Sequence, residues 1–155
     1  MDPAEPIDVI PLQLSGRIFG IDQRLVRGVE PMEAYTPVPA GPEFLLGMVL
    51  VDGTVVAMVD LAWLLGTPSD RSSYRYQVVL RRGRLEVACG VETVGRARRI
   101  VPEELTATDD GLYLCLGATL DGMTVIDGEA LLAESVLIPS TESDDDDDDA
   151  EEEAD

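Results

Sequence analysis

Hydrophobic and polar positions along the chain fall into short alternating or fully apolar runs, which are typical of β-strands. The runs are rich in Val, Ile and Leu, and clusters of Gly, Pro, Asp or Ser separate them. We therefore predict an all-β protein with short helical turns. The predicted strand segments are residues 7–14, 17–22, 26–32, 44–51, 54–59, 76–83, 84–92, 111–120 and 123–126.

Two places along the chain combine a strand end with a short helix. Asp52-Gly53 separates two strand segments, and both residues suit the positive φ angles of a two-residue hairpin turn. Asp60 then precedes the sequence LAWLL, which predicts a short helix with Asp60 as its N-cap and Gly66 at its end. Asp127 is predicted to begin a second short helix in the same way.

These features are part of a longer internal repeat. Four short motifs recur in the same order, at offsets of 70, 70, 69 and 67 residues. Each match alone is weak, but a nearly constant offset indicates a duplicated unit. The pairs are Gly20-Ile21-Asp22 with Gly90-Val91-Glu92, Leu46-Gly47 with Leu116-Gly117, Asp52-Gly53 with Asp121-Gly122, and Val59-Asp60 with Ile126-Asp127.

The repeat predicts how the chain is organised. Each unit has about five short strands, and a small sheet is stable only when it curls or packs on another layer. We expect two small barrels that share a core, because neither unit is large enough to be stable alone. The expected single domain covers residues 1–140, with a first barrel at 7–66, a linker at 67–73 and a second barrel at 74–134. Residues 141–155 are expected to form a disordered acidic tail.

The net charge of the chain limits the classes of molecule that it can bind. The chain has 31 acidic residues and 11 basic ones, all of the latter arginine, and its formal net charge is −20. An acidic chain without lysine suits a salt-rich cytoplasm, where screening weakens self-repulsion, so we expect a halophilic, archaeal source. A mesophilic acidic protein with a codon-driven arginine bias is the lesser alternative. The surface disfavours nucleic acid and anionic membranes as partners. With no apolar run long enough to cross a membrane, the protein is expected to be soluble and intracellular.

The chain offers little for catalysis. It contains no histidine, which removes the commonest general base and metal ligand. Cys89 and Cys115 lie far apart in apolar runs and are expected to be buried hydrophobic residues. Asp60 and Asp127 could form a carboxylate pair, but two duplicated N-caps are the stronger interpretation. We expect no enzyme activity, no cofactor and no metal.

Several of these motifs together resemble one family. The sequence "FGIDQRLVRGVE" is followed by "TPVPAGPEFLLGMVLVDGTVVAMVDLAWLLG", and the second half contains "CGVETVGRARRIVPEEL" and "YLCLGATLDGMTVIDGEALL". In this order and spacing they are similar to the CheW-type chemotaxis coupling proteins. The resemblance covers roughly residues 7–132.

The resemblance implies a fold of two five-stranded barrels of the Src-homology-3 type. It also implies a non-catalytic, cytoplasmic adaptor, which couples the cytoplasmic tip of chemoreceptors to a CheA-type histidine kinase in an array at the inner face of the membrane. A divergent scaffold in another two-component pathway is the alternative. The resemblance gives Val26, Val29, Val94 and Ile100 as candidates for a receptor groove, although each of them could equally be a core residue. Its candidates for the kinase or partner interface are Gly28, Pro37, Pro39, Asp52 and Gly53.

The sequence departs from the family pattern at three positions. The family usually has Arg where Asp52 stands, often has Glu at the position of Gly28, and has Pro at the position of Ala57. Asp cannot replace a bidentate Arg contact, because the sign of its charge is opposite. Partner choice is therefore expected to differ, even where the fold is retained.

Two further features are open to more than one interpretation. Arg81, Arg82, Arg84, Arg96, Arg98 and Arg99 place six of the eleven basic residues in one short region. We favour internal pairing with the nearby Glu86, Glu92, Glu103 and Glu104 over a docking face for an acidic partner. We expect the Trp63 side chain to fill the seam between the helical turn and the first barrel, with an exposed partner anchor as the alternative.

Overall fold

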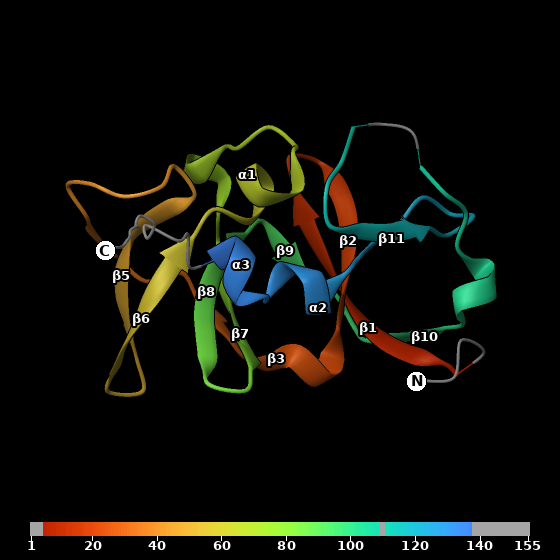
Figure 1. Cartoon of the computed structure of the whole chain (residues 1–155), viewed down its shortest axis with the longest axis horizontal. Helices are drawn as coiled ribbons and strands as arrows, with labels where there is room; N and C mark the ends of the chain where they lie inside the picture. Colours follow the sequence, from red (N-terminus) through yellow and green to blue (C-terminus); the bar gives the residue numbers. More distant parts are fainter. Residues whose placement is uncertain (1–4, 109–110, 138–155) are drawn as a thin grey trace, which may run out of the picture.

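The predicted strand segments form two sheets in the computed structural model, which describes residues 5–108 and 111–137 (Figure 1). Sheet A has the order β10-β1-β2-β12-β11, with β9 also paired to β1, and sheet B has the order β3-β7-β8-β6-β5-β4. Sheet A contains β1 (Ile7–Leu14), β2 (Arg17–Asp22), β9 (Thr93–Val94), β10 (Arg98–Ile100), β11 (Cys115–Ala118) and β12 (Thr124–Ile126). Sheet B contains β3 (Val26–Pro31), β4 (Thr36–Pro37), β5 (Leu45–Val51), β6 (Thr54–Val59), β7 (Tyr76–Arg82) and β8 (Leu85–Val91).

Short helical segments connect and cover the sheets. The α-helices are α1 (Leu61–Leu65), α2 (Gly128–Leu131) and α3 (Glu134–Leu137). The 3-10 turns are η1 (Gln23–Leu25), η2 (Arg71–Ser73) and η3 (Pro102–Glu104). All nine predicted strand segments contain a strand, and the all-β prediction is confirmed. Each sheet has six strands instead of five, because β4 and β9 add a two-residue strand to each. The predicted acidic tail at 141–155 lies outside the described residues.

The predicted boundaries of the two barrels, 7–66 and 74–134, are wrong. Sheet A combines the N-terminal hairpin β1–β2 with β9 to β12 from the second half of the chain, and sheet B combines β3 to β6 with the hairpin β7–β8. Each repeat therefore contributes its first hairpin to the sheet completed by the other repeat. Periodicity identifies strands and their faces, but it does not identify their partners, so a sequential division was the simplest assumption.

The exchange is symmetrical between the repeats. Hairpin β1–β2 pairs antiparallel with β10 and parallel with β12, while hairpin β7–β8 pairs antiparallel with β3 and parallel with β6. Thr36 pairs with Met48 in sheet B, and Thr106 pairs with Ala118 in sheet A, 70 residues further along in each case. The duplication found in the sequence thus extends to individual strand pairs.

Buried side chains form three clusters: one on sheet A, one on sheet B and one between the two sheets. One cluster, including Met58 and Val79, lies on one face of sheet B, and another, including Val9 and Val125, lies on one face of sheet A. The largest cluster contains side chains from both sheets, among them Phe19 of β2 and Val87 of β8. Because this shared cluster is the largest, burial of apolar area couples the two sheets into one unit.

Candidate partner-binding surfaces

The β5–β6 hairpin presents an apolar pair to solvent at one edge of sheet B. Leu50 and Val55 are directly opposite each other in the register, and each is 62% exposed. The turn between the strands has φ angles of 50° at Asp52 and 79° at Gly53, which confirms the predicted two-residue turn. An exposed cross-strand pair of this size is suited to contact with another protein.

An ion pair connects the tip of this hairpin to β3, the edge strand on the far side of β7 and β8. Arg27 Nη1 lies 3.5 Å from Asp52 Oδ2, and Arg27 Nε lies 3.1 Å from Glu86 Oε2. The Asp52 side chain nevertheless remains 71% exposed. The aspartate that stands in place of the family's arginine is therefore partly neutralised by an arginine of the same sheet.

Sheet A carries an equivalent hairpin in the second repeat. Arg98 Nη1 lies 2.9 Å from Asp121 Oδ2, and the hydrogen bond from Arg98 holds the pKa of Asp121 below its ordinary value. Leu120 precedes this aspartate and is 99% exposed. Each sheet thus ends in an Asp-Gly turn that is bound by an arginine and flanked by an exposed leucine.

The structure places the five kinase-interface candidates on sheet B or on the loop that follows β4. Gly28 lies on β3, next to Arg27, where an added Cβ would meet no atom within 4 Å. Pro37 lies on β4 opposite Gly47, and Pro39 follows in an exposed loop. Asp52 and Gly53 form the hairpin tip and are exposed. Arg27 brings the tip close to the strand that contains Gly28.

The four receptor-groove candidates are divided between the sheets. Val26 and Val29 lie on β3 of sheet B, with Val29 41% exposed. Val94 lies on β9 of sheet A, opposite Leu12. Ile100 is fully buried in the core cluster of sheet A, so it is a core residue and cannot line an open groove. Val26 and Val94 both pack against the shared core while remaining partly exposed.

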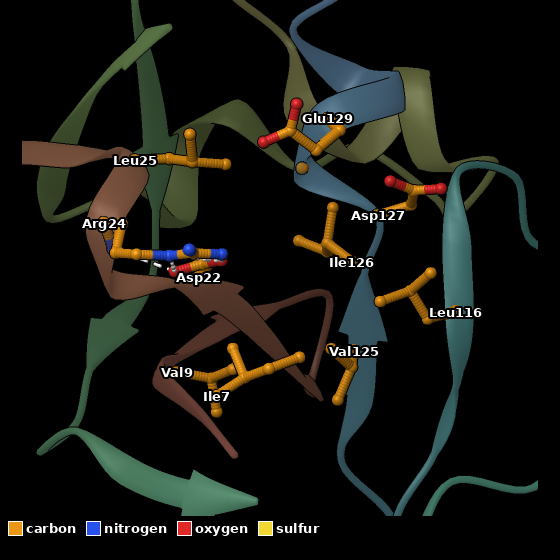
Figure 2. A pocket seen from close by; sticks show the side chains of 11 residues that line it. Ile7, Val9, Asp22, Arg24, Leu25, Leu116, Val125, Ile126, Asp127 and Glu129 are labelled. Atoms are coloured by element: carbon orange, nitrogen blue, oxygen red, sulfur yellow. Dashed lines mark hydrogen bonds and ion pairs between the residues drawn. The ribbon is translucent and has the colours of Figure 1, made fainter. Parts of the chain in front are cut away.

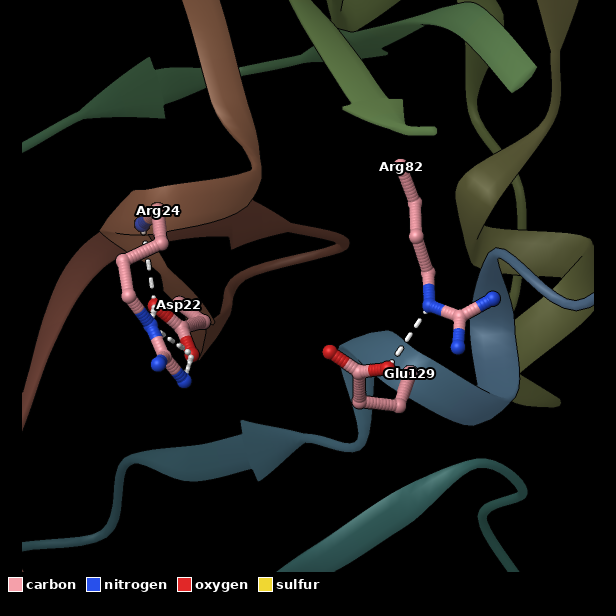
Figure 3. Close-up of polar contacts among 4 residues, drawn as sticks. All are labelled: Asp22, Arg24, Arg82 and Glu129. Carbon is pink, nitrogen blue, oxygen red and sulfur yellow. Dashed lines mark hydrogen bonds and ion pairs between the residues drawn. The ribbon is translucent and has the colours of Figure 1, made fainter. Parts of the chain in front are cut away.

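A cavity of about 400 Å³ lies between the β1–β2 hairpin and the β11–β12–α2 segment (Figure 2). Its apolar wall includes Leu25, Leu116 and Ile126, and its polar groups include Asp22 and Glu129. Two ion pairs fix the side chains around it: Arg24 Nη2 to Asp22 Oδ2 at 2.7 Å, and Arg82 Nε to Glu129 Oε1 at 2.6 Å (Figure 3). This cavity could not be predicted from the sequence, because its lining comes from two groups of residues that are more than 90 positions apart.

The arginine-rich region does form internal ion pairs, but the predicted partners were wrong. Besides Arg82 with Glu129 and Arg98 with Asp121, Arg99 Nε lies 3.0 Å from Asp8 Oδ1. The hydrogen bond between Arg99 and Asp8 lowers the pKa of the carboxyl and raises that of the guanidinium. The cause of the error is topological, since β10 pairs with β1, which places Arg99 opposite Asp8, while Arg98 binds the turn between β11 and β12.

Two of the expected partners serve as acceptors for backbone groups instead. Glu92 accepts from the backbone N–H of Ser15 at 2.8 Å, and Glu104 accepts from the backbone N–H of Val101 at 2.8 Å. Glu104 therefore satisfies its own local turn, whereas Glu92 satisfies the β1–β2 turn, 77 residues away in the sequence.

Trp63 and the cysteines also differ from expectation. Trp63 does not fill a seam, because it is 46% exposed and rests on the ring of Phe44 at a centroid distance of 5.9 Å. Cys89 is buried as expected, whereas Cys115 is only partly buried. Burial raises the pKa of the Cys89 thiol to about 12.

Asp60 and Asp127 are N-caps, as the sequence predicts. Asp60 accepts from the backbone N–H of Trp63, and Asp127 accepts from that of Ala130. Within residues 5–108 and 111–137, no group of three His, Cys, Asp or Glu side chains is arranged to hold a metal ion. In the same ranges, no helix has the length and apolar character needed to cross a bilayer.

Comparison with known proteins agrees with the fold. Residues 8–138 match the family described as "CheW-like domain". "Chemotaxis protein CheW" of Thermotoga maritima is 25% identical over 131 residues, which cover 84% of this chain and 85% of that protein. The crystal structure of "scaffolding protein TtCheW" from Thermoanaerobacter tengcongensis has a TM-score of 0.65 at 17% identity, and the alignment covers 79% of this chain and 89% of that one.

Proposed function

This chain belongs to the family of proteins with a CheW-like domain, and on that premise we propose that it is a non-catalytic chemotaxis adaptor. In this proposal it couples the cytoplasmic tip of chemoreceptors to a CheA-type histidine kinase. It would act in the cytoplasm and be recruited to receptor arrays at the inner face of the membrane. The similarity to a chemotaxis protein and to a scaffolding protein supports this role.

The observation that carries the proposal is the exposed apolar pair on the β5–β6 hairpin. Leu50 and Val55 lie next to Asp52 and Gly53, which are the interface candidates from the family resemblance. We propose that this hairpin contacts the kinase, with the apolar pair as the anchor and the Arg27–Asp52 ion pair at its rim. Aspartate in place of arginine at the tip then selects a kinase whose surface carries a matching change.

The receptor contact is proposed to involve the partly exposed candidates Val26, Val29 and Val94. Val26 and Val29 follow η1 on β3, and Val94 follows β8 on the adjoining segment. Helical receptor tips bind grooves through apolar residues at helical spacing, so apolar side chains with partial exposure are suited to this contact. A divergent scaffold of another two-component pathway is the alternative, and a deletion that leaves taxis intact but alters another response would favour it.

The test of the kinase contact is a binding titration with the kinase regulatory domain. We expect Val55→Glu to weaken binding at least about tenfold, because it places a charge in an apolar contact. The matched control is Ile18→Glu, since Ile18 is 40% exposed on β2 of the other sheet. Equal binding by wild type and Val55→Glu would contradict the proposed interface.

We also infer a halophilic source from the excess of acidic residues and the absence of lysine. Screening of the self-repulsion should raise the free energy of unfolding as KCl increases from about 0.1 M to about 1 M, where the Debye length falls from about 10 Å to about 3 Å. Denaturation curves at several salt concentrations measure this. A free energy of unfolding that does not change with salt would contradict the inference.

A further inference from the structure

A second cavity, which we call the arginine groove, lies between η1–β3 and the β7–β8 hairpin. It has a volume of about 390 Å³. Its lining contains three arginines and no carboxylate, in a chain whose formal net charge is −20. The lining residues are Arg24, Leu25, Val26, Arg27, Arg81 and Gly83.

The three guanidinium groups retain donors that can bind an anion. Arg24 binds Asp22 through Nε and Nη2, and Arg27 uses Nε and Nη1 for Glu86 and Asp52. Arg81 makes no ion pair with any residue that the structure describes and donates its Nε–H to the carbonyl of Gly83. A guanidinium has five N–H donors in a planar arrangement, so each of the three can donate to a further carboxylate.

Helix α2, near the C-terminal end of the described chain, lies next to this groove. Gly128 of α2 is packed so closely on the Leu25 side chain that an added Cβ would collide with it. Glu129 of the same helix is ion-paired with Arg82, between the lining residues Arg81 and Gly83 (Figure 3). Helix α3 contacts α2 and packs Leu137 against the shared core. Helix α2 therefore flanks the groove, and the described chain ends at Leu137, one short helix after α2.

The sequence beyond Leu137 has the charge that this groove lacks. Residues 142–155 contain eleven acidic side chains, including six consecutive aspartates at 144–149. The first of them, Asp144, is seven residues beyond Leu137, so an extended chain reaches it within about 25 Å at 3.3–3.6 Å per residue. Attachment to the same molecule gives such a segment a millimolar effective concentration at the groove.

We propose that the acidic C-terminal segment, residues 141–155, docks in the arginine groove of its own chain. The contact is electrostatic and is therefore weakened by salt. Because Val26 lines the groove and Gly28 follows on the same strand, a docked segment covers part of the surface that a partner would need. An acidic segment of another protein is the alternative occupant, and the test separates the two.

The experiment uses the full chain in two forms, at about 0.1 M salt. One is the wild type, and the other replaces all six aspartates, Asp144→Asn through Asp149→Asn. A fluorescent hexa-aspartate peptide is titrated into each form, and the Nε–Hε resonances of the arginines are recorded by NMR without peptide. We expect the peptide to bind the asparagine form about fivefold more tightly than the wild type, because the wild-type segment competes for the groove. We also expect the Arg81 resonance to differ between the two forms and to become equal at about 1 M salt.

Arg81→Gln in the asparagine form should weaken peptide binding about fivefold. The matched control is Arg96→Gln, because Arg96 is an exposed arginine of the β9–β10 connection, outside the groove lining. Equal peptide binding by the wild type and the asparagine form would overturn the proposal. If that equal binding were also weakened by Arg81→Gln, the groove would bind acidic segments of other proteins and not the segment of its own chain. Equal losses for Arg81→Gln and Arg96→Gln would also overturn it, as would an unchanged Arg81 resonance. None of these readouts involves a kinase or a receptor, so failure here leaves the proposed adaptor function untouched.

Discussion

Asp60 and Asp127 occupy equivalent N-cap positions in the two repeats, but their surroundings differ. Asp60 is fully buried and accepts hydrogen bonds from Ser69 Oγ at 2.6 Å and Tyr74 OH at 3.3 Å, with Arg71 Nη2 at 3.5 Å. These contacts connect the end of β6 to the segment that joins the two repeats. Asp127 is only partly buried and accepts from the Ala130 backbone N–H at 3.1 Å.

The two aspartates should therefore differ in their contribution to stability. Asp127→Ala removes an N-cap, which costs about 1 kcal/mol of unfolding free energy. Asp60→Ala also leaves the buried Tyr74 hydroxyl without this acceptor and Arg71 without its ion pair, so we expect a loss of about 3 kcal/mol. Chemical denaturation at constant salt measures both values. Costs that agree within about 0.5 kcal/mol would show that Asp60 is only a cap.

Two buried groups near Asp60 predict how stability depends on alkaline pH. Burial raises the pKa of Tyr74 from 10.0 to about 12, and it raises the pKa of Cys89 from 9.0 to about 12. In the unfolded chain both groups lose their protons at a lower pH than in the folded chain, so the folded state binds more protons between pH about 9 and about 12. The stabilisation that these protonated groups contribute is complete below pH about 9 and is lost as the pH rises towards about 12. The free energy of unfolding should fall over this interval, and less steeply in Cys89→Ala; a flat profile would contradict the assignment.

At the scale of elements, the exchange of hairpins between the repeats makes a prediction about fragments. A cut between Asp70 and Arg71, in the exposed connection between α1 and η2, separates β1–β6 from β7–β12. Each fragment then lacks the hairpin that completes its sheet. We expect neither fragment to unfold cooperatively alone, and the two together to restore the native spectrum. Cooperative unfolding of residues 1–70 by themselves would favour the sequential barrels over the exchanged ones.

This exchange also marks the limit of what the sequence predicts. Every strand segment with clear periodicity was found, as were the Asp52-Gly53 turn and both N-caps, because these depend on local residues. The Asp8 partner of Arg99 was missed, because pairing of β10 with β1 brings together two residues that are 91 positions apart. The Asp121 partner of Arg98 was missed, because periodicity does not show which turn lies beside a strand. The prediction that Ile100 lines the receptor groove is wrong, because its side chain is buried. A single apolar residue on a short strand does not reveal which face of the sheet it occupies.

At the scale of the whole molecule, the two Asp-Gly hairpins lie in different sheets. Figure 1 shows the β5–β6 hairpin near one end of the longest axis and the β10–β11 side of sheet A towards the other. The shared core links the two sheets, so the β5–β6 hairpin proposed for the kinase and the receptor candidate Val94 of sheet A lie on one folded unit. An adaptor needs this property, because its two partners must be bound at the same time without competing.

The most direct measurement of the adaptor proposal is therefore a linkage titration. The affinity for a receptor cytoplasmic fragment is measured with and without a saturating concentration of the kinase regulatory domain. If the partners use separate surfaces, the dissociation constant for the receptor fragment measured with the kinase domain should be within about threefold of the value measured without it, or lower. A ternary complex should then elute as one species. Mutually exclusive binding, or no binding to either partner at about 1 M salt or above, would contradict the account.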